Sequence, residues 1–300
     1  MSGARDRDVM FDKNGREKNK IEAGVLYLVA TPIGNLADLS ERAVKVLSEV
    51  DFIAAEDTRN TAKLLSYLGI SKPMVSYFQH NRTERGEVIC DRLKEGQSCA
   101  LVTDAGTPAI SDPGEDLVRL CAEKNIRVTF VPGACAAIAA LALSGLFTGR
   151  FAFEGFVSGA KGERKKRLTE LKDEERTLIF YEAPHHLVNT LDDFYEAFGN
   201  RKIALCRELT KLNEEITRTT LAEAVEYYKK NAPRGEYVLV VEGGKKEKDD
   251  FWVSLTPLQH VQFYMDSGMD KNTAIKTVAK ERGVQKNEIY KEVVNNKTDE

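Results

Sequence analysis

The sequence predicts an α/β protein built from two α/β domains and a small helical module at the C-terminal end. Short apolar runs alternate with helical patterns of about ten residues, which is typical of β-α-β units around a mostly parallel sheet. The alternation pauses near residues 134–150, and the charged segment GGKKEKDD (243–250) precedes further helical patterns. We therefore expect a mobile tail at 1–21, α/β domains at 22–133 and 134–244, and a linker with a helical module at 245–300.

In the first half, each predicted strand is a short apolar run that stops at a polar or glycine-rich loop. Strands are expected at 25–30, 51–57, 74–78, 98–104 and 126–132, and helices at 36–50, 61–70, 86–96 and 115–125. Ser40 or Asp38 lies near the start of the first helix, and Gly69 closes the second. Ligands of open α/β sheets bind beyond the carboxyl ends of the strands, so TPIGN (31–35), EDTR (56–59) and DAGTP (104–108) should face one crevice.

The second half begins with an alanine-rich helix at 132–145 and then returns to strands and helices. Strands are expected at 151–157, 177–183, 202–209 and 235–243, and helices at 162–172, 187–199 and 220–231. In the terminal module, Thr256 is the expected N-cap of a helix, with Pro257 at its first position and Gly268 past its end. Two more helical patterns, separated by a turn at Gly283, resemble a helix-turn-helix, and contact with nucleic acid is one interpretation of them.

Composition and charge limit the class of protein. With 42% apolar and 30% charged residues the chain has the composition of a globular protein, and its net charge of −3 gives no overall attraction to nucleic acid. The charged N-terminus lacks the apolar core of a signal peptide, and the apolar segment 131–147 is too short and too rich in alanine to span a membrane. Five cysteines without a CxxC pair indicate reduced thiols in a cytoplasmic protein, with neither a disulfide framework nor a metal site.

The segment VTDAGTPAISDPG (102–114) is the expected ligand-binding loop of the first domain. Phosphate loops are rich in glycine and P-loops add a lysine, whereas this loop carries Asp104 and Asp112 and no basic residue. The chain also lacks the GxGxxG, GxxxxGK[ST], GxSxG and HExxH motifs. An acidic glycine loop suits a ligand with amines, hydroxyls or a positive charge, and S-adenosylmethionine is such a ligand. Asp112 has two interpretations, a ligand contact or the cap of a helix that begins near Gly114.

Eight segments in a fixed order resemble the rRNA-methylating branch of the tetrapyrrole (corrin/porphyrin) methylase superfamily. They are LVATPIGNLADLSERAVKVL, AAEDTRNTAKLL, FQHNRTER, LVTDAGTPAISDPGEDLV, VPGACAAIAALALSGL, FYEAPHHL, CRELTKLNEE and GEYVLVVEG. The resemblance runs from about residue 24 to 292. It implies two α/β domains with the cofactor S-adenosylmethionine in the cleft between them. It also implies a homodimer that methylates the ribose 2′-hydroxyl of a cytidine in small-subunit (16S) rRNA.

The resemblance places the cofactor against loops of both domains. The implied contacts are Pro32, Asp104, Ala105, Gly106, Thr107 and Ile110 from the first domain, and Cys135, Ala136, Tyr181, Glu182, Ala183, Leu209, Gly235 and Glu236 from the second. Two positions depart from the family pattern. Ala134-Cys135 stands where Pro-Ser is frequent, so no serine hydroxyl is offered to the cofactor, and His186 stands where Arg is frequent, so this position has no fixed cation for RNA phosphate.

Methyl transfer is an in-line displacement at carbon, so the protein must align the 2′-oxygen with the methyl group and help to remove the hydroxyl proton. We expect two ion pairs, Glu208–Lys211 and Asp57–Arg59, to frame the target ribose, and Glu182 is a further catalytic candidate. For each of these residues, an ordinary salt bridge at a domain interface is the alternative interpretation.

RNA contacts are expected from local basic surfaces despite the negative net charge. The candidates are Arg82, Arg85, Lys161, Arg164, Lys165, Lys166, Arg167, Lys271, Lys276, Lys280, Arg282 and Lys286. The segment 161–172 has six basic and two acidic residues, and a solvated helix face is its alternative interpretation. Two other functions stay open: a sibling that methylates a carbon of a tetrapyrrole, and a regulator that senses S-adenosylmethionine and binds nucleic acid without turnover.

Overall fold

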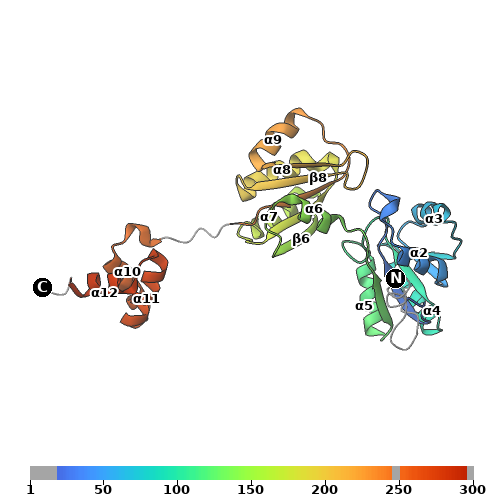
Figure 1. The fold of residues 1–300 in the computed structure, drawn as a ribbon, viewed down its shortest axis with the longest axis horizontal. Coiled ribbons are helices and arrows are strands. Elements are labelled where there is room, and N and C mark those ends of the chain that lie inside the picture. The colour runs from blue at the N-terminus through green and yellow to red at the C-terminus, as the bar shows by residue number, and fades with distance from the viewer. Residues whose placement is uncertain (1–18, 245–250, 296–300) are drawn as a thin grey trace, which may run out of the picture. The chain divides into compact units, whose positions relative to one another are not determined.

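The computed structural model describes residues 19–244 and 251–295, which fall into two compact units, Met1–Gly244 and Lys245–Glu300 (Figure 1). Residues 1–18 of the expected tail and residues 245–250 of the expected linker lie outside the described part of the chain. Within the described residues, no helix is long and apolar enough to cross a membrane. The two α/β domains belong to the first unit and the terminal helices to the second.

The first domain is a five-stranded parallel sheet in the order β3-β2-β4-β1-β5. Its elements are β1 (Val25–Val29), η1 (Leu36–Asp38), α2 (Glu41–Glu49), β2 (Phe52–Ala55), α3 (Thr58–Tyr67), β3 (Met74–Ser76), α4 (Arg82–Lys94), β4 (Cys99–Val102), α5 (Gly114–Glu123) and β5 (Arg127–Val131). Helices α2 and α3 pack on one face of the sheet through Leu47 and Leu65, and α4 and α5 pack on the other through Ile89 and Leu117. Both faces are covered, which explains why the central strands are continuous apolar runs.

Strands β1 and β4 form the switch point of this sheet. They lie side by side, but the chain continues from β1 to α2 on one face and from β4 to α5 on the other. Ligands of open α/β sheets bind at such points. Backbone hydrogen bonds join the two loops, because Thr31 N donates to Gly106 O at 2.9 Å and Gly106 N donates to Thr31 O at 3.1 Å. The fold therefore brings the TPIGN and DAGTP loops together.

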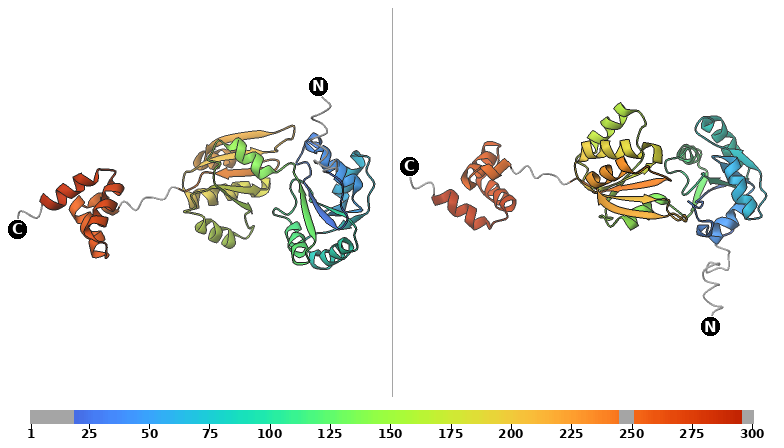
Figure 2. Two further views of the ribbon diagram at one scale, coloured as in Figure 1. Left: turned by 60° about the horizontal axis from the view of Figure 1, so that its bottom comes forward. Right: turned by 90° about the horizontal axis from the view of Figure 1, so that it is seen from above.

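The second domain is a mixed sheet in the order β6-β7-β10-β8-β9, drawn from two directions in Figure 2. Its elements are α6 (Ala136–Ser144), β6 (Phe151–Phe156), α7 (Lys161–Glu170), β7 (Thr177–Glu182), α8 (Pro184–Phe198), β8 (Lys202–Arg207), β9 (Glu215–Thr220), α9 (Leu221–Lys230) and β10 (Tyr237–Val241). Only β6 and β7 pair in parallel. Helix α6 covers one face, and α7, α8 and α9 cover the other. The expected α/β architecture with two domains is confirmed, but the expectation of a mostly parallel sheet holds for the first domain alone, because three of the four strand pairs of the second sheet are antiparallel.

Several expected bounds were wrong, including the starts of α6 and α8, and three local differences have an identifiable reason. Strand β9 was missed because its sequence, EITRTT, is polar and pairs along one side only, as an edge strand. Helix α3 begins at Thr58 rather than at 61, because the Asp57 carboxylate accepts a hydrogen bond from Arg59 N at 2.8 Å and caps the helix earlier. Helix α4 begins at Arg82, so the polar RTER sequence is helical rather than part of a loop.

The terminal unit contains a 3₁₀ turn and three helices around a small apolar core. Its elements are η2 (Phe251–Ser254), α10 (Pro257–Asp266), α11 (Lys271–Arg282) and α12 (Lys286–Asn295), and its core includes Val261, Ile275, Val278 and Ile289. The expected Thr256 cap and Pro257 start are confirmed, and Gly283 ends α11 in the left-handed conformation. Arg282, an expected RNA contact, instead donates hydrogen bonds to Trp252 O and Leu255 O and to His260 Nδ1, so its guanidinium is committed to the fold of this unit.

Candidate active site

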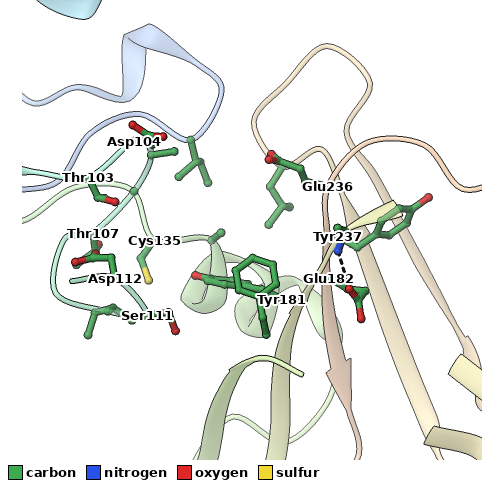
Figure 3. Close-up of a pocket in the computed structure, with 18 of the residues that line it drawn as sticks. Thr103, Asp104, Thr107, Ser111, Asp112, Cys135, Tyr181, Glu182, Glu236 and Tyr237 are labelled. Carbon is green, nitrogen blue, oxygen red and sulfur yellow. Dashed lines mark hydrogen bonds between the residues drawn. The ribbon is translucent and has the colours of Figure 1, made fainter. Parts of the chain in front are cut away.

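A cavity of about 440 Å³ lies beyond the carboxyl ends of β1, β2 and β4, and residues of both α/β domains line it. The lining residues are Ile33, Glu56, Thr103, Asp104, Ala105, Gly106, Thr107, Ile110, Ser111, Asp112, Cys135, Ala136, Phe156, Tyr181, Glu182, Ala183, Glu208, Leu209, Lys211, Glu236 and Tyr237. In Figure 3, Asp104, Thr107 and Asp112 lie on one side of the cavity and Tyr181 and Glu236 on the other. The TPIGN, EDTR and DAGTP loops each contribute to the lining, so the expected crevice is confirmed.

The acidic loop is held in an unusual backbone conformation. Ala109 and Ser111 have φ angles of 67° and 60°, in the left-handed region that residues with a Cβ adopt at a cost of about 1–2 kcal/mol each. Asp112 Oδ1 accepts hydrogen bonds from Ala109 N at 3.0 Å and Gly114 N at 2.7 Å, and so stabilises this turn and the start of α5 together. Backbone strain of this kind occurs at binding and catalytic sites. The loop shape is therefore fixed before any ligand arrives.

Asp112 also contributes to the electrostatics of the cavity. Its second oxygen, Oδ2, is buried and has no hydrogen-bond partner among the described residues. Burial raises the pKa of Asp112, because a buried carboxylate loses its hydration. Both earlier interpretations of Asp112 are compatible with the structure, since the residue lines the cavity and also hydrogen-bonds the first residue of α5.

A second strained segment forms the opposite wall. Glu208 and Thr210 have φ angles of 51° and 66°, and Lys211 Nζ lies 2.9 Å from Glu208 Oε1 and 2.8 Å from Glu236 Oε2. Glu208 Oε1 also accepts a hydrogen bond from Glu236 N at 2.9 Å, and this bond is the main reason why the pKa of Glu208 is lowered. Burial lowers the pKa of Lys211, but its hydrogen bonds to both carboxylates outweigh that effect and raise the pKa overall. Lys211 is therefore a cation and Glu208 an anion at neutral pH.

The two walls meet at a glycine of the first loop. A Cβ on Gly34 would lie 2.3 Å from Cγ of Lys211, so only glycine lets the TPIGN loop approach the lysine side chain this closely. Gly106 is also in the left-handed region, with a φ of 84°, and its Cα faces the side chain of Ile33. The close approach of Gly34 to Lys211 fixes the TPIGN loop against the second domain, whereas the contact between Gly106 and Ile33 joins two loops of the first domain.

Glu182 lines the cavity, but its carboxylate is already engaged. Glu182 is only 5% exposed. Thr190 Oγ1 donates a hydrogen bond to its Oε2 at 2.6 Å, and Ala183 N donates one to its Oε1 at 2.8 Å. Both oxygens thus accept hydrogen bonds that hold the end of β7 against α8. In this arrangement Glu182 acts on the shape of the site rather than as a free base.

The lining is strongly acidic. Lys211 is the single basic residue of the lining, and six lining residues are acidic: Glu56, Asp104, Asp112, Glu182, Glu208 and Glu236. Thr103 Oγ1 donates to Glu56 Oε2 at 2.6 Å, which fixes that carboxylate beside the acidic loop. The pKa of Asp104 is raised, first by burial and then by the negative charge of Glu56. A ligand that carries phosphate groups would be repelled by this lining, whereas a cationic ligand would be attracted.

Most of the residues predicted from the sequence lie in the cavity lining. Of the predicted cofactor-binding and catalytic residues, those outside it are Pro32, Gly235, Asp57 and Arg59. The expected Asp57–Arg59 ion pair is present at 2.7 Å, and the Arg59 side chain is 86% exposed. Asp57 also caps α3, a structural role that was not expected for it from the sequence. The ion pair between Glu208 and Lys211 is present as well, inside the cavity.

Six lining residues were not singled out from the sequence: Ile33, Glu56, Thr103, Ser111, Phe156 and Tyr237. Five of them stand within or beside the recognised motifs, so those motifs could have pointed to them. Phe156 is different, because its orientation depends on an irregularity in β6 that the sequence pattern does not reveal.

Apart from Arg282, described above, and the half-buried Lys271, the basic residues expected to contact RNA divide into three groups. Arg164 is buried, pairs with Asp193 at 2.6 Å and donates to Ser158 O at 3.1 Å, so it joins α7 to α8 and does not face solvent. Ion pairs with acidic neighbours also engage three exposed or half-buried members, Arg82, Lys165 and Arg167. Exposed members without an ion pair in the described part of the chain are Arg85, Lys161, Lys166, Lys276, Lys280 and Lys286.

Comparison with known proteins places this architecture in a family. The family model described as Tetrapyrrole (Corrin/Porphyrin) Methylases matches residues 25–225. A protein named ribosomal RNA small subunit methyltransferase I, from Halalkalibacterium halodurans, is 50% identical over 272 residues, which are 90% of this chain and 94% of the relative. The chain belongs to the ribosomal RNA small subunit methyltransferase I branch of the tetrapyrrole methylase family. It is a methyltransferase of that family.

Further relatives agree with this placement. Proteins of the same name from Synechocystis sp. and Bacillus subtilis are each 46% identical, with 89% and 90% of this chain and 96% and 94% of the relatives covered. Among solved structures, uroporphyrin-III C-methyltransferase from Thermus thermophilus complexed with S-adenosyl homocysteine has a TM-score of 0.53. It is 19% identical, with 72% of this chain and 96% of that chain covered, and so shows a shared fold.

Proposed function

We propose that the protein transfers the methyl group of S-adenosylmethionine to the ribose 2′-hydroxyl of a cytidine in small-subunit (16S) rRNA. The observation that carries the proposal is the acidic, preformed cavity at the strand switch point of a chain whose relatives, 46–50% identical, are named for small-subunit rRNA methylation. The cavity supplies the place for the cofactor, and the family supplies the class of acceptor.

The residues present fit S-adenosylmethionine. The cavity volume of about 440 Å³ lies within the range of about 300–1,000 Å³ that is usual for small-molecule and cofactor sites. The acidic lining matches the sulfonium and ammonium charges of this cofactor. Cys135, the N-cap of α6, makes no side-chain capping bond within the described chain, so first-turn N–H groups at Cys135 and Ala136 are suited to the cofactor carboxylate. When bound, the cofactor supplies an electrophilic methyl group on a good leaving group.

We assign the direct role toward the ribose to Lys211. Its ammonium lies in the cavity, is charged, and is held at a fixed position by Glu208 and Glu236. A fixed cation at this place would stabilise negative charge that develops on the 2′-oxygen as its proton leaves. Glu208 and Glu236 then act as positioning residues through Lys211. Arg59 lies outside the lining with an exposed guanidinium, which suits it to a backbone phosphate of the bound RNA.

Substitution of the lysine tests this assignment. Lys211→Met keeps the aliphatic stem and removes the charge, and we expect a loss of about 10²-fold in the single-turnover rate with little change in affinity for S-adenosylhomocysteine. Lys229→Met, at an exposed lysine that pairs with Asp192, is the matched control. The assay measures transfer of a radiolabelled methyl group to small ribosomal subunits, followed by nuclease digestion to locate the label on ribose. An unchanged rate for Lys211→Met contradicts the assignment, and label elsewhere than on ribose contradicts the proposed reaction.

RNA binding is further assigned, in addition to Arg59, to the exposed cations without ion pairs. They lie on α4, on α7 and on the terminal helices: Arg85, Lys161, Lys166, Lys276, Lys280 and Lys286. Phosphate contacts are local and sensitive to salt, so a protein with a net charge of −3 can still bind RNA through such groups. Titration with salt should weaken binding to small subunits, and charge removal at these positions should reduce the slope of that dependence.

We further propose that the protein acts as a cytoplasmic homodimer. Three apolar side chains, Ile138 and Leu143 on α6 and Phe147 shortly after it, are exposed to 49%, 38% and 67% in the single chain. They offer an apolar surface of the kind that a second copy would cover. Sedimentation measurements that give the mass of a single chain at micromolar concentration would exclude the dimer.

A tetrapyrrole acceptor is the alternative function. It is favoured by the description of the family model and by the solved structures, but those structures are below 20% identity. The relatives of 46–50% identity carry the rRNA name, and the described chain presents exposed lysines on the terminal helices. Incubation with labelled cofactor and either small subunits or a tetrapyrrole separates the two functions by the product that carries the label.

A further inference from the structure

Phe156 is the most exposed aromatic side chain in the cavity lining. It is 63% exposed, although a phenylalanine in a lining position could bury its ring against the protein. Single exposed apolar residues are common on protein surfaces and need no function. The exposure of Phe156 has a specific cause, an irregularity of the strand that carries it.

A β-bulge turns Phe156 toward the cavity. Along β6, Phe153 pairs with Ile179, but the next pair is Gly155 with Phe180, so Glu154 is an extra residue without a partner in β7. Side chains alternate between the two faces of a sheet, so in a regular strand Phe156, three positions after Phe153, would lie on the opposite face. With the extra residue, Phe156 pairs with Tyr181, a lining residue, and shares its face of the sheet.

The conformation of Gly155 maintains this bulge. Its φ is 65°, a left-handed value that glycine adopts without strain. A Cβ at this position would also lie 2.8 Å from the hydroxyl oxygen of Ser111, a residue of the acidic loop. The glycine therefore allows the bulge and lets the end of β6 approach the first domain. Bulges are frequent beside active sites, where they change the direction of a side chain.

The ring of Phe156 is supported at one side by the protein. Its centroid lies 5.5 Å from that of Tyr181 at an interplanar angle of 60°, and the Tyr181 ring contacts Phe153 in the same edge-to-face manner at 5.0 Å. Edge-to-face contacts leave ring faces available, and the exposure of Phe156 indicates that much of its ring meets solvent. Phe156 is thus an aromatic surface of fixed position beside the cavity.

We propose that Phe156 is the stacking surface for the nucleobase of the target nucleotide. This inference rests on the proposed function, because it requires an RNA acceptor. Exposed aromatic rings bind unstacked bases of single-stranded RNA by stacking. A base held on this ring fixes the attached ribose beside the cavity, which is what alignment of the 2′-oxygen with the methyl group requires.

The position of Phe156 favours the target base over the adenine of the cofactor. Tyr181 is the more buried ring of the pair, and burial raises its pKa to about 12, whereas Phe156 stands at the exposed end of the same aromatic group. A ligand that arrives from solvent meets Phe156 first. Five residues further along the chain, α7 begins with Lys161, whose exposed ammonium suits a phosphate of the same RNA strand.

The test compares four variants of the full chain. Phe156→Ala removes the ring, Phe156→Leu keeps an apolar side chain without a flat face, and Phe156→Trp restores a ring. Phe151→Ala is the matched control, because Phe151 lies on the same strand, is 38% exposed and is absent from the lining. For each protein, kcat and KM are measured with small ribosomal subunits that lack the modification, and affinity for S-adenosylhomocysteine is measured by calorimetry. Thermal unfolding confirms that each variant is folded.

We expect Phe156→Ala and Phe156→Leu to lower kcat/KM for subunits by about tenfold, which is about 1.4 kcal/mol and within the range for loss of one base–aromatic stack. Affinity for S-adenosylhomocysteine should be unchanged, Phe156→Trp should restore the activity, and Phe151→Ala should behave as the wild type. Equal kcat/KM for wild type and Phe156→Ala would overturn the inference, as would a parallel loss of S-adenosylhomocysteine affinity, which would assign the ring to the cofactor. Absence of methyl transfer by the wild type would instead overturn the proposed function.

Discussion

Gly235 offers a sharp test of how backbone conformation maintains the cavity wall. Its φ is 76°, and a Cβ built on it would lie 2.5 Å from Cγ and 2.7 Å from Cδ of Glu208. Gly69, at the end of α3, has a φ of 68° and nothing within 4 Å of the same hypothetical atom. The two glycines therefore share the conformational constraint but differ in the steric one, and Gly69→Ala is a matched control for Gly235→Ala.

The expected magnitudes follow from this difference. Alanine in the left-handed region costs about 1–2 kcal/mol, and the smaller entropy of the unfolded chain offsets about 0.4–1 kcal/mol. Gly69→Ala should thus lower the free energy of unfolding by roughly 1 kcal/mol. Gly235→Ala must also displace Glu208 from its hydrogen bonds to Glu236 N and Lys211 Nζ, and loss of one such charged bond adds about 1.5–3 kcal/mol. The total for Gly235→Ala is then roughly 2–4 kcal/mol.

Denaturant unfolding and methyl transfer to small ribosomal subunits measure the two consequences. Gly235→Ala should slow methyl transfer at least tenfold, because the Lys211 ammonium loses one of the two carboxylates that hold it. A double-mutant cycle identifies the cause: in a Glu208→Ala background the steric conflict is gone, so Gly235→Ala should cost no more there than Gly69→Ala does. If Gly235→Ala and Gly69→Ala have equal effects in the wild-type background, the steric argument is refuted.

Three further predictions concern other parts of the molecule. Arg164→Ala should lower the free energy of unfolding by about 3–5 kcal/mol in denaturant titration, because it leaves Asp193 buried without its partner. Lys166→Ala should leave stability unchanged and weaken binding to subunits. The opposite pattern would show that Arg164 contacts RNA. The raised pKa values of Asp104 and Asp112 mean that the folded state binds protons more tightly than the unfolded state, so the stability due to these groups is greatest below about pH 4 and falls as pH rises through the raised values. Ionisation of these carboxyl groups over the same pH range should strengthen the binding of cationic S-adenosylmethionine more than that of S-adenosylhomocysteine, as measured by calorimetry. Asp104→Asn should reduce this difference. Equal pH dependence for both ligands would contradict a role for cavity charge. Removal of the second unit, Lys245–Glu300, should weaken methylation of small subunits while cofactor affinity stays constant, and a loss of cofactor affinity would show that this unit contributes to the cavity.

Features that depend on local pattern can be read from the chain alone. The parallel sheet of the first domain follows from continuous apolar runs such as FIAA and CALV, because strands covered on both faces have no polar side. The position of the cavity follows from the strand-end rule, and the acidity of its loop can be read directly at Asp104 and Asp112. The cap at Thr256 and the turn at Gly283 are equally local, since each is set by one residue type in one conformation.

Features that depend on contacts between distant residues required the tertiary structure. Arg164 and Lys166 stand two positions apart in one basic run, but only folding decides that the first meets Asp193 inside the protein while the second faces solvent. Glu208 and Glu236 converge on Lys211 only because β8 and β10 are neighbours in the second sheet. Phe156 is the clearest case, because one unpaired residue in β6 reverses the face that alternation predicts. The sequence gives the type of each residue, but packing decides its partner and its exposure.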